Sequence, residues 1–480
     1  MMDNVIIGRK YEQKLINDCC KSGRAELIAI YGRRRVGKTY LVRSMFNDKF
    51  AFSFTGLYDV SRQVMIEQFR KNLERYSGER IPKIKDWFEA FDKLRSYLET
   101  LKRDRLIVFL DELPWMDTHK SNFLQAFSFF WNDWASTVRN LKIIVCGSAA
   151  TWMMSHIIGD KGGLYGRVSR AVYLAPFTLL ETEEFLRNVK GMDISHRQTM
   201  EIYMTMGGIP YYLNMIEKGV PIDSCIDRLF FAQGAPLRGE FDFLFRSLYK
   251  DSKNYLKVIE ALSTRLRGMT RKELVSAAKI SEGGDVTSVL DNLLACDFIR
   301  RYTSIGKSER DAVYQLTDLF SLFYLRFVDK NNGQDEHFWS NNRGDGSRRS
   351  WSGYAFEQVC LHHLPQIKSS LGISGILCNA YSWISKSSSS NGVQQKGAQI
   401  DLLIDRADNV INMCEMKYAS EEFAIDADYE KKLIERSALF KQVSKTKKSV
   451  LITFVTTFGI RHNSHSGIVQ NEVTMDDLFR

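Results

Sequence analysis

The sequence predicts an α/β fold whose N-terminal part is a parallel sheet flanked by helices. Short apolar runs occur at residues 27–31, 106–110 and 141–147. Each has the length of a buried strand, and the stretches between them are long enough for the helices that connect parallel strands. Residues 50–54 and 64–101 repeat the alternation of a short strand with a long helical stretch. This alternation is typical of α/β domains.

The loop after the first apolar run has the sequence Gly-Arg-Arg-Arg-Val-Gly-Lys-Thr, and residues 40–46 after it have apolar side chains at helical spacing. Glycines allow backbone N–H groups to face phosphates, and the helix N-terminus adds a positive dipole end. The lysine of such a loop reaches the β- and γ-phosphates, and its threonine hydroxyl ligates Mg²⁺. We therefore predict an ATP site with Mg²⁺ at Gly32, Arg33, Arg34, Arg35, Val36, Gly37, Lys38 and Thr39.

The apolar run at 105–112 ends in two carboxylates, Asp111 and Glu112. In a parallel sheet the carboxyl end of this strand lies beside the phosphate loop, where Asp111 can hold Mg²⁺. Glu112 is then placed to activate the attacking water. An ordinary helix start, where acidic residues are also common, is the alternative. We expect hydrolysis of the nucleotide rather than binding alone.

The length, apolar content and charge of the chain limit the classes of protein to which it can belong. The 480 residues allow about three domains, at roughly 150 residues each. No apolar run reaches the roughly 18 residues of a membrane span, and the N-terminus lacks a secretory signal, so we expect a cytoplasmic protein with no membrane partner. The formal net charge is +10, but residues 331–480 contain 17 basic and 17 acidic residues, so the basic excess lies before them.

The order of several short motifs resembles one family. Gly8, Arg9 and Glu12 form a Gly-Arg-x-x-Glu box before the phosphate loop, and Pro210 ends the run Gly-Gly-Ile-Pro after the predicted sheet. With the phosphate loop and the Leu-Asp-Glu strand between them, these motifs resemble the prokaryotic STAND-like AAA ATPases, usually described as archaeal-type ATP-binding proteins. The resemblance covers about residues 5–330. It implies that Gly8 and Arg9 border the adenine and that Pro210 packs on it.

The resemblance also suggests roles for polar residues near two later strands. Ser148 follows the strand at 141–147, where the family places a group that contacts the γ-phosphate or the attacking water. A helix cap is the equally plausible interpretation of this serine. Arg167 and Arg170 precede the next strand and are candidates for arginine fingers, acting within the chain or on a second copy. Surface arginines are the alternative.

Residues 253–328 are predicted to form a winged helix, because three helical segments are followed by two strand-like runs. The outer face of the third helix, at 285–296, lacks the arginine or lysine that a DNA-reading helix usually carries. We favour a contact with protein over the reading of DNA for this module.

The C-terminal part resembles the PD-(D/E)xK restriction-endonuclease-like fold, with the element order helix, strands, helix, strand. Asp401 and Glu415 lie on predicted neighbouring strands and are hard oxygen ligands for Mg²⁺. Lys417 lies on the same strand face as Glu415 and can position the attacking water, and Glu357 on the first helix completes the metal ligands. Ile400 occupies the motif's usual proline position. The alternatives are a nuclease-like fold that only binds a partner and a coincidental pair of strands joined by a salt bridge.

We therefore expect a P-loop AAA-like domain with a helical lid at 1–250, a winged helix at 251–330, a polar linker at 331–350 and a nuclease-like α/β domain at 351–480. The expected function is ATP hydrolysis coupled to Mg²⁺-dependent action on nucleic acid. The alternative is an ATP-gated interaction switch. The expected partners are ATP, DNA or RNA, and a second copy of the chain.

Overall fold

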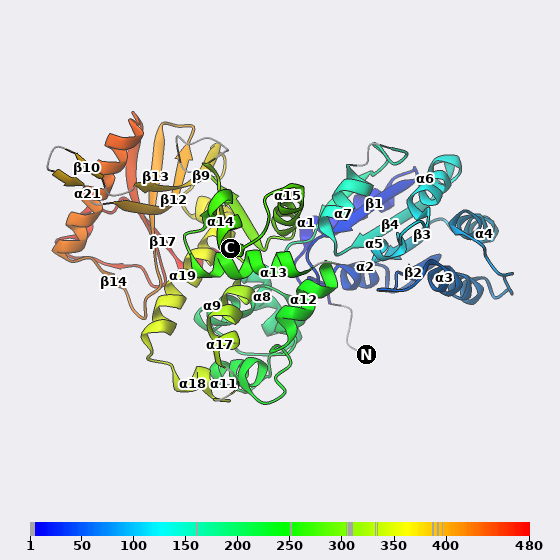
Figure 1. The fold of residues 1–480 in the computed structure, drawn as a ribbon, viewed down its shortest axis with the longest axis horizontal. Helices are drawn as coiled ribbons and strands as arrows, with labels where there is room; N and C mark the ends of the chain where they lie inside the picture. The colour runs from blue at the N-terminus through cyan, green and yellow to red at the C-terminus, as the bar shows by residue number, and fades with distance from the viewer. Residues whose placement is uncertain are drawn as a thin grey trace. The chain divides into compact units, whose positions relative to one another are not determined.

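The computed structural model describes residues 5–159, 162–249, 252–303, 305, 311–331, 333, 335–385, 388–390, 393–395 and 397–480. The chain divides into two compact units, which Figure 1 shows as a ribbon. Unit 1 comprises Met1–Pro176, Ile209–Tyr211 and Arg246–Lys250. Unit 2 comprises Phe177–Gly208, Tyr212–Phe245 and Asp251–Arg480.

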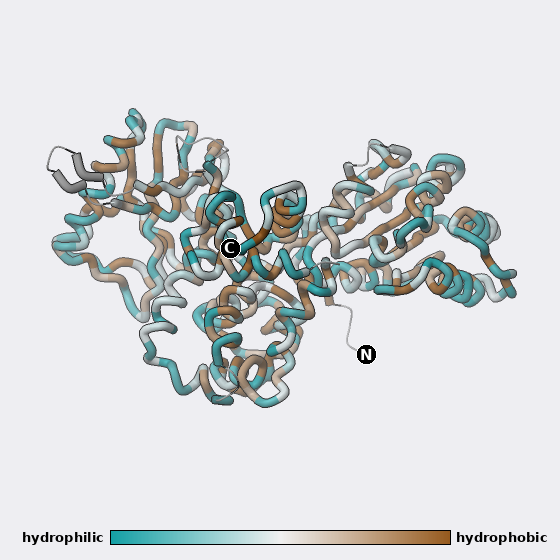
Figure 2. The backbone as a smooth tube through the Cα atoms, in the orientation of Figure 1, coloured by the Kyte–Doolittle hydropathy of each residue, from teal (hydrophilic) through white to brown (hydrophobic). Residues whose placement is uncertain are grey.

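Unit 1 is built on a parallel sheet with the strand order β2-β3-β4-β1-β5, so the predicted α/β fold with a parallel sheet is confirmed. The strands are hydrophobic along most of their length (Figure 2) because helices cover them. The elements are α1 (Lys10–Lys21), β1 (Glu26–Tyr31), α2 (Lys38–Phe46), β2 (Phe52–Thr55), α3 (Arg62–Ser77), α4 (Trp87–Thr100), β3 (Leu106–Asp111), α5 (Leu113–Met116), α6 (Phe123–Asp133), η1 (Ala135–Thr137), β4 (Leu141–Gly147), α7 (Ala150–Met153), η2 (Met154–Ile158) and β5 (Arg170–Tyr173).

The helical stretch expected at 64–101 is two helices, α3 and α4. Gly78 ends α3 in the left-handed conformation, with φ of 73°, and Pro82 follows in the connection. Aromatic side chains of α3, α4 and α6 then pack together beside the sheet, with Trp87 fully buried at their centre. The break allows both helices to contribute to one core.

Unit 2 begins with helices and ends with a mixed sheet of order β17-β15-β13-β12-β9. Its middle part contains α13 to α15 and an antiparallel sheet of order β6-β8-β7. Its first elements, with two helices that cross the unit boundary, are α8 (Leu179–Glu184), η3 (Phe185–Val189), α9 (His196–Met206), α10 (Pro210–Leu213), α11 (Ile222–Ile226), η4 (Asp227–Phe231), α12 (Glu240–Leu248), α13 (Ser252–Thr264), β6 (Met269–Thr270), α14 (Arg271–Ala278), α15 (Gly284–Ala295), β7 (Ile299–Tyr302) and β8 (Val313–Leu316).

The remaining elements of unit 2 follow the antiparallel sheet in the sequence. Helix α21 packs on the mixed sheet through Leu433 and Phe440. The elements are α16 (Leu319–Phe323), η6 (Tyr324–Val328), α17 (Asp329–Asn331), α18 (Phe338–Asn341), α19 (Gly346–His362), α20 (Leu364–Ser370), β9 (Cys378–Ser385), β10 (Ser388–Ser390), β11 (Val393–Gln395), β12 (Ala398–Arg406), β13 (Val410–Lys417), β14 (Phe423–Ala424), α21 (Ala427–Ser444), β15 (Ser449–Thr456), β16 (Ile460–Arg461), η7 (Ser466–Ile468), β17 (Asn471–Thr474) and η8 (Met475–Phe479).

Much of the segment 331–350, expected as a polar linker, is helical and packed within unit 2. It contains α18 and the start of α19. Trp339 is buried, and its backbone N–H donates to Oδ1 of Asp227 at 2.7 Å. The polar composition that suggested a linker has another cause: Asp345 caps α19, and Arg343 and Arg348 pair with the buried Asp223.

Asp223, which is 6% exposed, joins this segment to the helices of unit 2. One oxygen accepts from Arg343 and the other from Arg348, both at 2.7 Å. Asp223→Ala is expected to lower the free energy of unfolding by about 3 kcal/mol, because it leaves the largely buried Arg348 without its carboxylate. Arg343→Ala is the control: that side chain is 75% exposed, and its loss should cost less than about 1 kcal/mol. Urea unfolding of the two variants tests this, and equal losses would contradict the role of burial.

His363 at the end of α19 is buried and joins this helix to α8. Its Nε2 accepts from the Leu179 N–H at 3.0 Å, and its Nδ1 donates to Val359 O at 2.8 Å. Burial, partly offset by the bond to Val359, lowers the pKa of His363 from 6.5 to about 4. The unfolded chain thus binds more protons between these two values, so stability is full above pH 6.5 and falls as the pH drops towards 4.

This linkage predicts a loss of about 3 kcal/mol of unfolding free energy between pH 6.5 and pH 4 from His363 alone. Urea unfolding across that range measures it. In His363→Asn the loss over the same range should be smaller by about that amount, since asparagine does not titrate. The same pH dependence in both proteins would exclude His363 as its source.

Candidate functional sites

The phosphate loop connects β1 to α2 in unit 1. Gly32 has φ of 142°, and a Cβ atom there would lie 2.4 Å from the carbonyl oxygen of Leu174, so this position requires glycine. Gly37, with φ of 91°, immediately precedes α2. The loop therefore delivers Lys38 and Thr39 to the first turn of α2, where backbone N–H groups and the helix dipole favour an anion.

The side chains that should contact phosphate and Mg²⁺ lie together. Lys38 Nζ donates to the carbonyl oxygens of Gly32 and Arg33, each at 2.9 Å. Thr39 Oγ1 donates to Oδ2 of Asp111 at 2.8 Å. Burial, with a further contribution from the charge of Glu112, raises the pKa of Asp111. A hydroxyl and a carboxylate at this spacing are the hard oxygen groups that Mg²⁺ prefers, so the residues fit the expected ion.

Glu112 follows β3 with φ of 47°. Its Oε2 accepts from the Ser148 hydroxyl at 2.7 Å and from the Ser148 N–H at 3.2 Å. Ser148 thus binds the carboxylate of Glu112 and does not cap α7, whose N-cap residue is Ala149. The structure brings together the candidate base and the polar residue of the neighbouring strand, β4.

Gly8, Arg9 and Pro210 are the residues that the family resemblance places around the adenine. Arg9 is buried and donates to the carbonyl oxygen of Ala175 at 2.6 Å, while Gly8 and Arg9 both have positive φ, of 57° and 53°. Pro210 is the first residue of α10. The next residue, Tyr211, lies with its ring centroid 4.0 Å from Cζ of Arg35, so the Gly-Gly-Ile-Pro run ends beside the phosphate loop.

Arg167 and Arg170 are both exposed. Arg170 opens β5 and is aligned with Ile28, three residues before the end of β1 at Tyr31. The phosphate loop follows Tyr31, so the ladder places Arg170 away from the nucleotide end of the sheet. Arg167 lies in the segment before β5. The strand pairing therefore does not bring Arg170 to the phosphate loop of its own chain.

The candidate residues of the C-terminal part line one cavity of about 510 Å³ in unit 2: Glu357 from α19, Asp401 from β12, and Glu415 with Lys417 from β13. Strands β12 and β13 are antiparallel, with Leu402 opposite Cys414, which sets Asp401 against Glu415. The pairing of β12 with β9 is irregular between Ile400 and Leu403, at the position of Asp401.

Several carboxylates line this cavity, and cationic side chains form ion pairs with one of them. Glu415, only 6% exposed, contacts the guanidinium of Arg436, Lys417 Nζ at 3.4 Å and the Tyr429 hydroxyl at 2.9 Å. Asp401 accepts from the side-chain amide of Gln399. Burial, and then the charge of Asp401, raises the pKa of Glu357 to about 8. Within the described part of the chain, no three His, Cys, Asp or Glu side chains are grouped to hold a metal ion.

The comparisons with known proteins concern mainly the first part of the chain. The family described as an ATPase domain predominantly from Archaea matches residues 7–216. The chain contains an archaeal-type ATPase domain. An uncharacterized protein of Methanocaldococcus jannaschii is 26% identical over 366 residues, which cover 76% of this chain and 78% of that protein.

The solved structures that resemble the chain include a Walker-type ATPase and an ORC2 protein. A Walker-type ATPase of Pyrococcus abyssi is 19% identical with a TM-score of 0.49, covering 67% of this chain and 96% of its own. The ORC2 protein of Aeropyrum pernix is 12% identical with a TM-score of 0.42, covering 68% of this chain and 95% of its own. The phosphate loop, Asp111, Glu112 and Ser148 described above all belong to the matched ATPase domain.

Outside the ATPase domain, sequence reasoning missed several residues of the C-terminal cavity. Arg436 and Tyr429 on α21 hold Glu415, and Arg267 and Gln315 also line the cavity. Tyr429, Lys432 and Arg436 recur at helical spacing, which was the available signal for a polar face of α21.

No helix in the described ranges combines the length and apolar character that a membrane span requires.

Proposed function

We propose that this protein hydrolyses ATP and couples hydrolysis to a Mg²⁺-dependent, nuclease-like C-terminal domain that acts on nucleic acid. The observation that carries the proposal is that Glu357, Asp401, Glu415 and Lys417 line one cavity. Carboxylates from different elements beside a lysine can hold a divalent ion and orient the water that attacks a phosphodiester.

In the ATPase domain, Lys38 contacts the β- and γ-phosphates, while Thr39 and Asp111 hold Mg²⁺. Glu112 orients and deprotonates the attacking water, and Ser148 positions the Glu112 carboxylate. The stacked Arg35 and Tyr211 support a STAND-like arrangement, in which Gly8, Arg9 and Pro210 border the base. Because Arg167 and Arg170 are exposed, they are proposed to complete the site of a second copy of the chain.

The elements from α13 to β8 support the winged helix proposed at 251–330. The three helices α13, α14 and α15 precede strands β7 and β8 as expected, and the short strand β6, which was not expected, joins their sheet. The outer face of α15 carries Asp285, Thr287 and Asp291, which suit a protein contact better than DNA phosphates. If the protein binds duplex DNA, it would therefore contact the phosphates through basic residues outside α15.

One observation favours the alternative, an ATP-gated switch whose nuclease-like fold binds without cleaving. The negative charge of Glu415 is already compensated by ion pairs with Arg436 and Lys417. These two cations take the place that a metal ion would have beside the carboxylate. A cavity in which cations hold the carboxylate can grip a phosphate without activating water.

The test incubates the purified full chain with plasmid, single-stranded DNA and RNA, with Mg²⁺ or Mn²⁺, with and without ATP. We expect cleavage of at least one substrate that requires the metal and changes with ATP. Metal-dependent binding without cleavage would replace the nuclease by the switch. Neither binding nor cleavage under any condition would overturn action on nucleic acid.

A further inference from the structure

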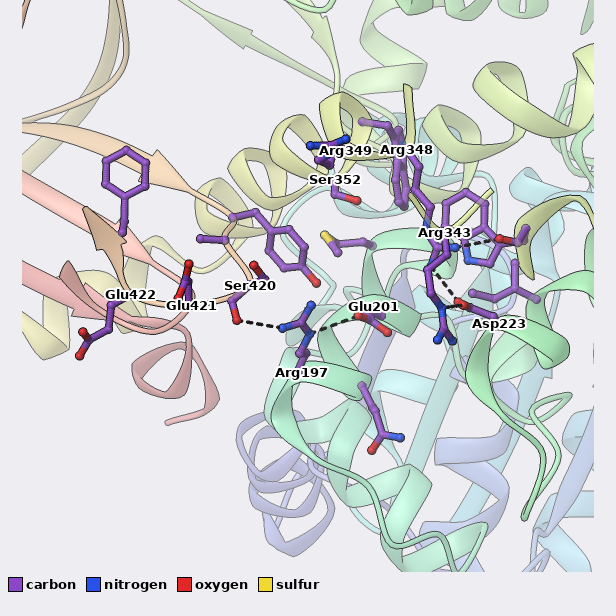
Figure 3. A pocket seen from close by; sticks show the side chains of 18 of the residues that line it. Arg197, Glu201, Asp223, Arg343, Arg348, Arg349, Ser352, Ser420, Glu421 and Glu422 are labelled. Atoms are coloured by element: carbon purple, nitrogen blue, oxygen red, sulfur yellow. Dashed lines mark hydrogen bonds and ion pairs between the residues drawn. The ribbon is translucent and has the colours of Figure 1, made fainter. Parts of the chain in front are cut away.

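Unit 2 contains a second, larger cavity of about 770 Å³ that the proposed function does not use (Figure 3). Its walls are α9, α11, the segment from α18 to α19, the loop at 418–424 and β16. None of its lining residues belongs to the phosphate loop or to the cavity that holds Asp401. We call it the arginine cavity, after Arg197, Arg343, Arg348, Arg349 and Arg461.

The arginines differ in how far protein carboxylates satisfy them. Arg343 and Arg348 are bound to the two oxygens of Asp223 (Figure 3). The hydrogen bonds of Arg197 are long, 3.4 Å to Glu201 and 3.5 Å to the carbonyl oxygen of Ser420, and its guanidinium lies 5.6 Å from the centroid of the Phe458 ring. Arg349 donates to the carbonyl oxygen of Gly344 at 3.3 Å, and no carboxylate of the described residues pairs with it. Arg197 and Arg349 therefore retain donor capacity towards an anion.

Aromatic side chains also form part of the wall. Trp339 and Trp351 lie 5.4 Å apart, edge to face. Burial, and then the charge of Glu201, raises the pKa of Tyr418, so its phenol stays neutral. The wall thus combines arginine donors with aromatic surface.

We propose that the arginine cavity binds a small phosphate-bearing ligand of nucleotide size. Guanidinium groups bind phosphate oxygens in bidentate fashion, and here they come from separate elements, which suits a ligand with more than one anionic oxygen. The volume lies within the usual range for small-molecule pockets. Glu421 and Glu422 also line the cavity and are exposed, and their charges oppose a long polyanion that continues out of it.

The experiment uses the full chain carrying Lys38→Ala, so that the phosphate loop does not contribute binding. Pyrophosphate, AMP, citrate and a single-stranded oligonucleotide are titrated by calorimetry. We expect saturable binding of pyrophosphate or AMP, with one ligand per chain, and at least tenfold weaker binding in Arg349→Ala. Arg326→Ala, an exposed arginine of unit 2 outside the cavity, is the control and should leave binding unchanged.

Several results would overturn the proposal. They are no saturable binding below about 1 mM, equal loss in Arg349→Ala and Arg326→Ala, citrate binding as tightly as the phosphates, or tighter binding of the oligonucleotide. Arg197→Gln provides a second test from another element, in case Arg349→Ala alters the melting temperature. Because cleavage is not measured, failure here leaves the proposed nuclease-like function untouched.

Discussion

Glu112→Gln is expected to bind ATP as the wild type does and to hydrolyse it about 10²- to 10⁴-fold more slowly. Glutamine keeps the size of the side chain and can still accept the hydrogen bond from Ser148, which Glu112 receives at 2.7 Å. It cannot take a proton from water. The groups proposed to bind ATP are instead Lys38, Thr39 and the loop N–H groups, which this change leaves in place. Phosphate release at saturating ATP and direct titration of ATP separate the two effects.

Two further variants serve as controls for this assignment. Lys38→Ala should lose ATP binding, because it removes the cation that reaches the phosphates. Ser148→Ala keeps the Glu112 carboxylate but removes one hydrogen bond to it, and should slow turnover by only about tenfold. If Glu112→Gln hydrolysed ATP at the wild-type rate, the base would be a different residue.

Much of unit 1 was predictable because its signals are local. The glycine spacing of the phosphate loop and the apolar run before it specify a strand, a turn and a helix within a short stretch of chain. Asp111 and Thr39 then meet because parallel strands end at one edge of the sheet. The bond between Ser148 and Glu112 was not predicted. From the sequence, Ser148 was expected to contact the γ-phosphate or the attacking water, and a helix cap was the equal alternative.

The errors arose where the deciding contacts are distant in sequence. Polar residues at 331–350 resembled a linker because their partners, Asp223 and Asp227, lie on helices more than a hundred residues earlier. Likewise, nothing near Glu415 in sequence indicated that Arg436 would hold it. The strand period of two did place Glu415 and Lys417 on one face, and both line the same cavity.

Asp401→Asn is expected to lower metal-dependent cleavage at least about 10²-fold and to leave ATP hydrolysis unchanged. The change removes one carboxylate charge from the cavity that also holds Glu357 and Glu415, while asparagine preserves shape and a hydrogen-bond acceptor. ATP hydrolysis should not respond, since the proposed ligands Thr39 and Asp111 and the proposed base Glu112 belong to a separate site. Cleavage of the best substrate and phosphate release, measured on the same preparation, test both halves.

Asp408→Asn is the matched control for this variant. Asp408 lies between β12 and β13, carries the same charge and pairs with Arg406, but it does not line the cavity. Its substitution should leave cleavage within about twofold of wild type, because the ion pair with Arg406 that it removes lies outside the cavity. Lys417→Ala should lose cleavage as Asp401→Asn does. If Asp401→Asn and Lys417→Ala both retained wild-type cleavage, the metal site would lie elsewhere. If no cleavage were present to lose but Asp401→Asn weakened metal-dependent binding of nucleic acid, the cavity would serve the switch.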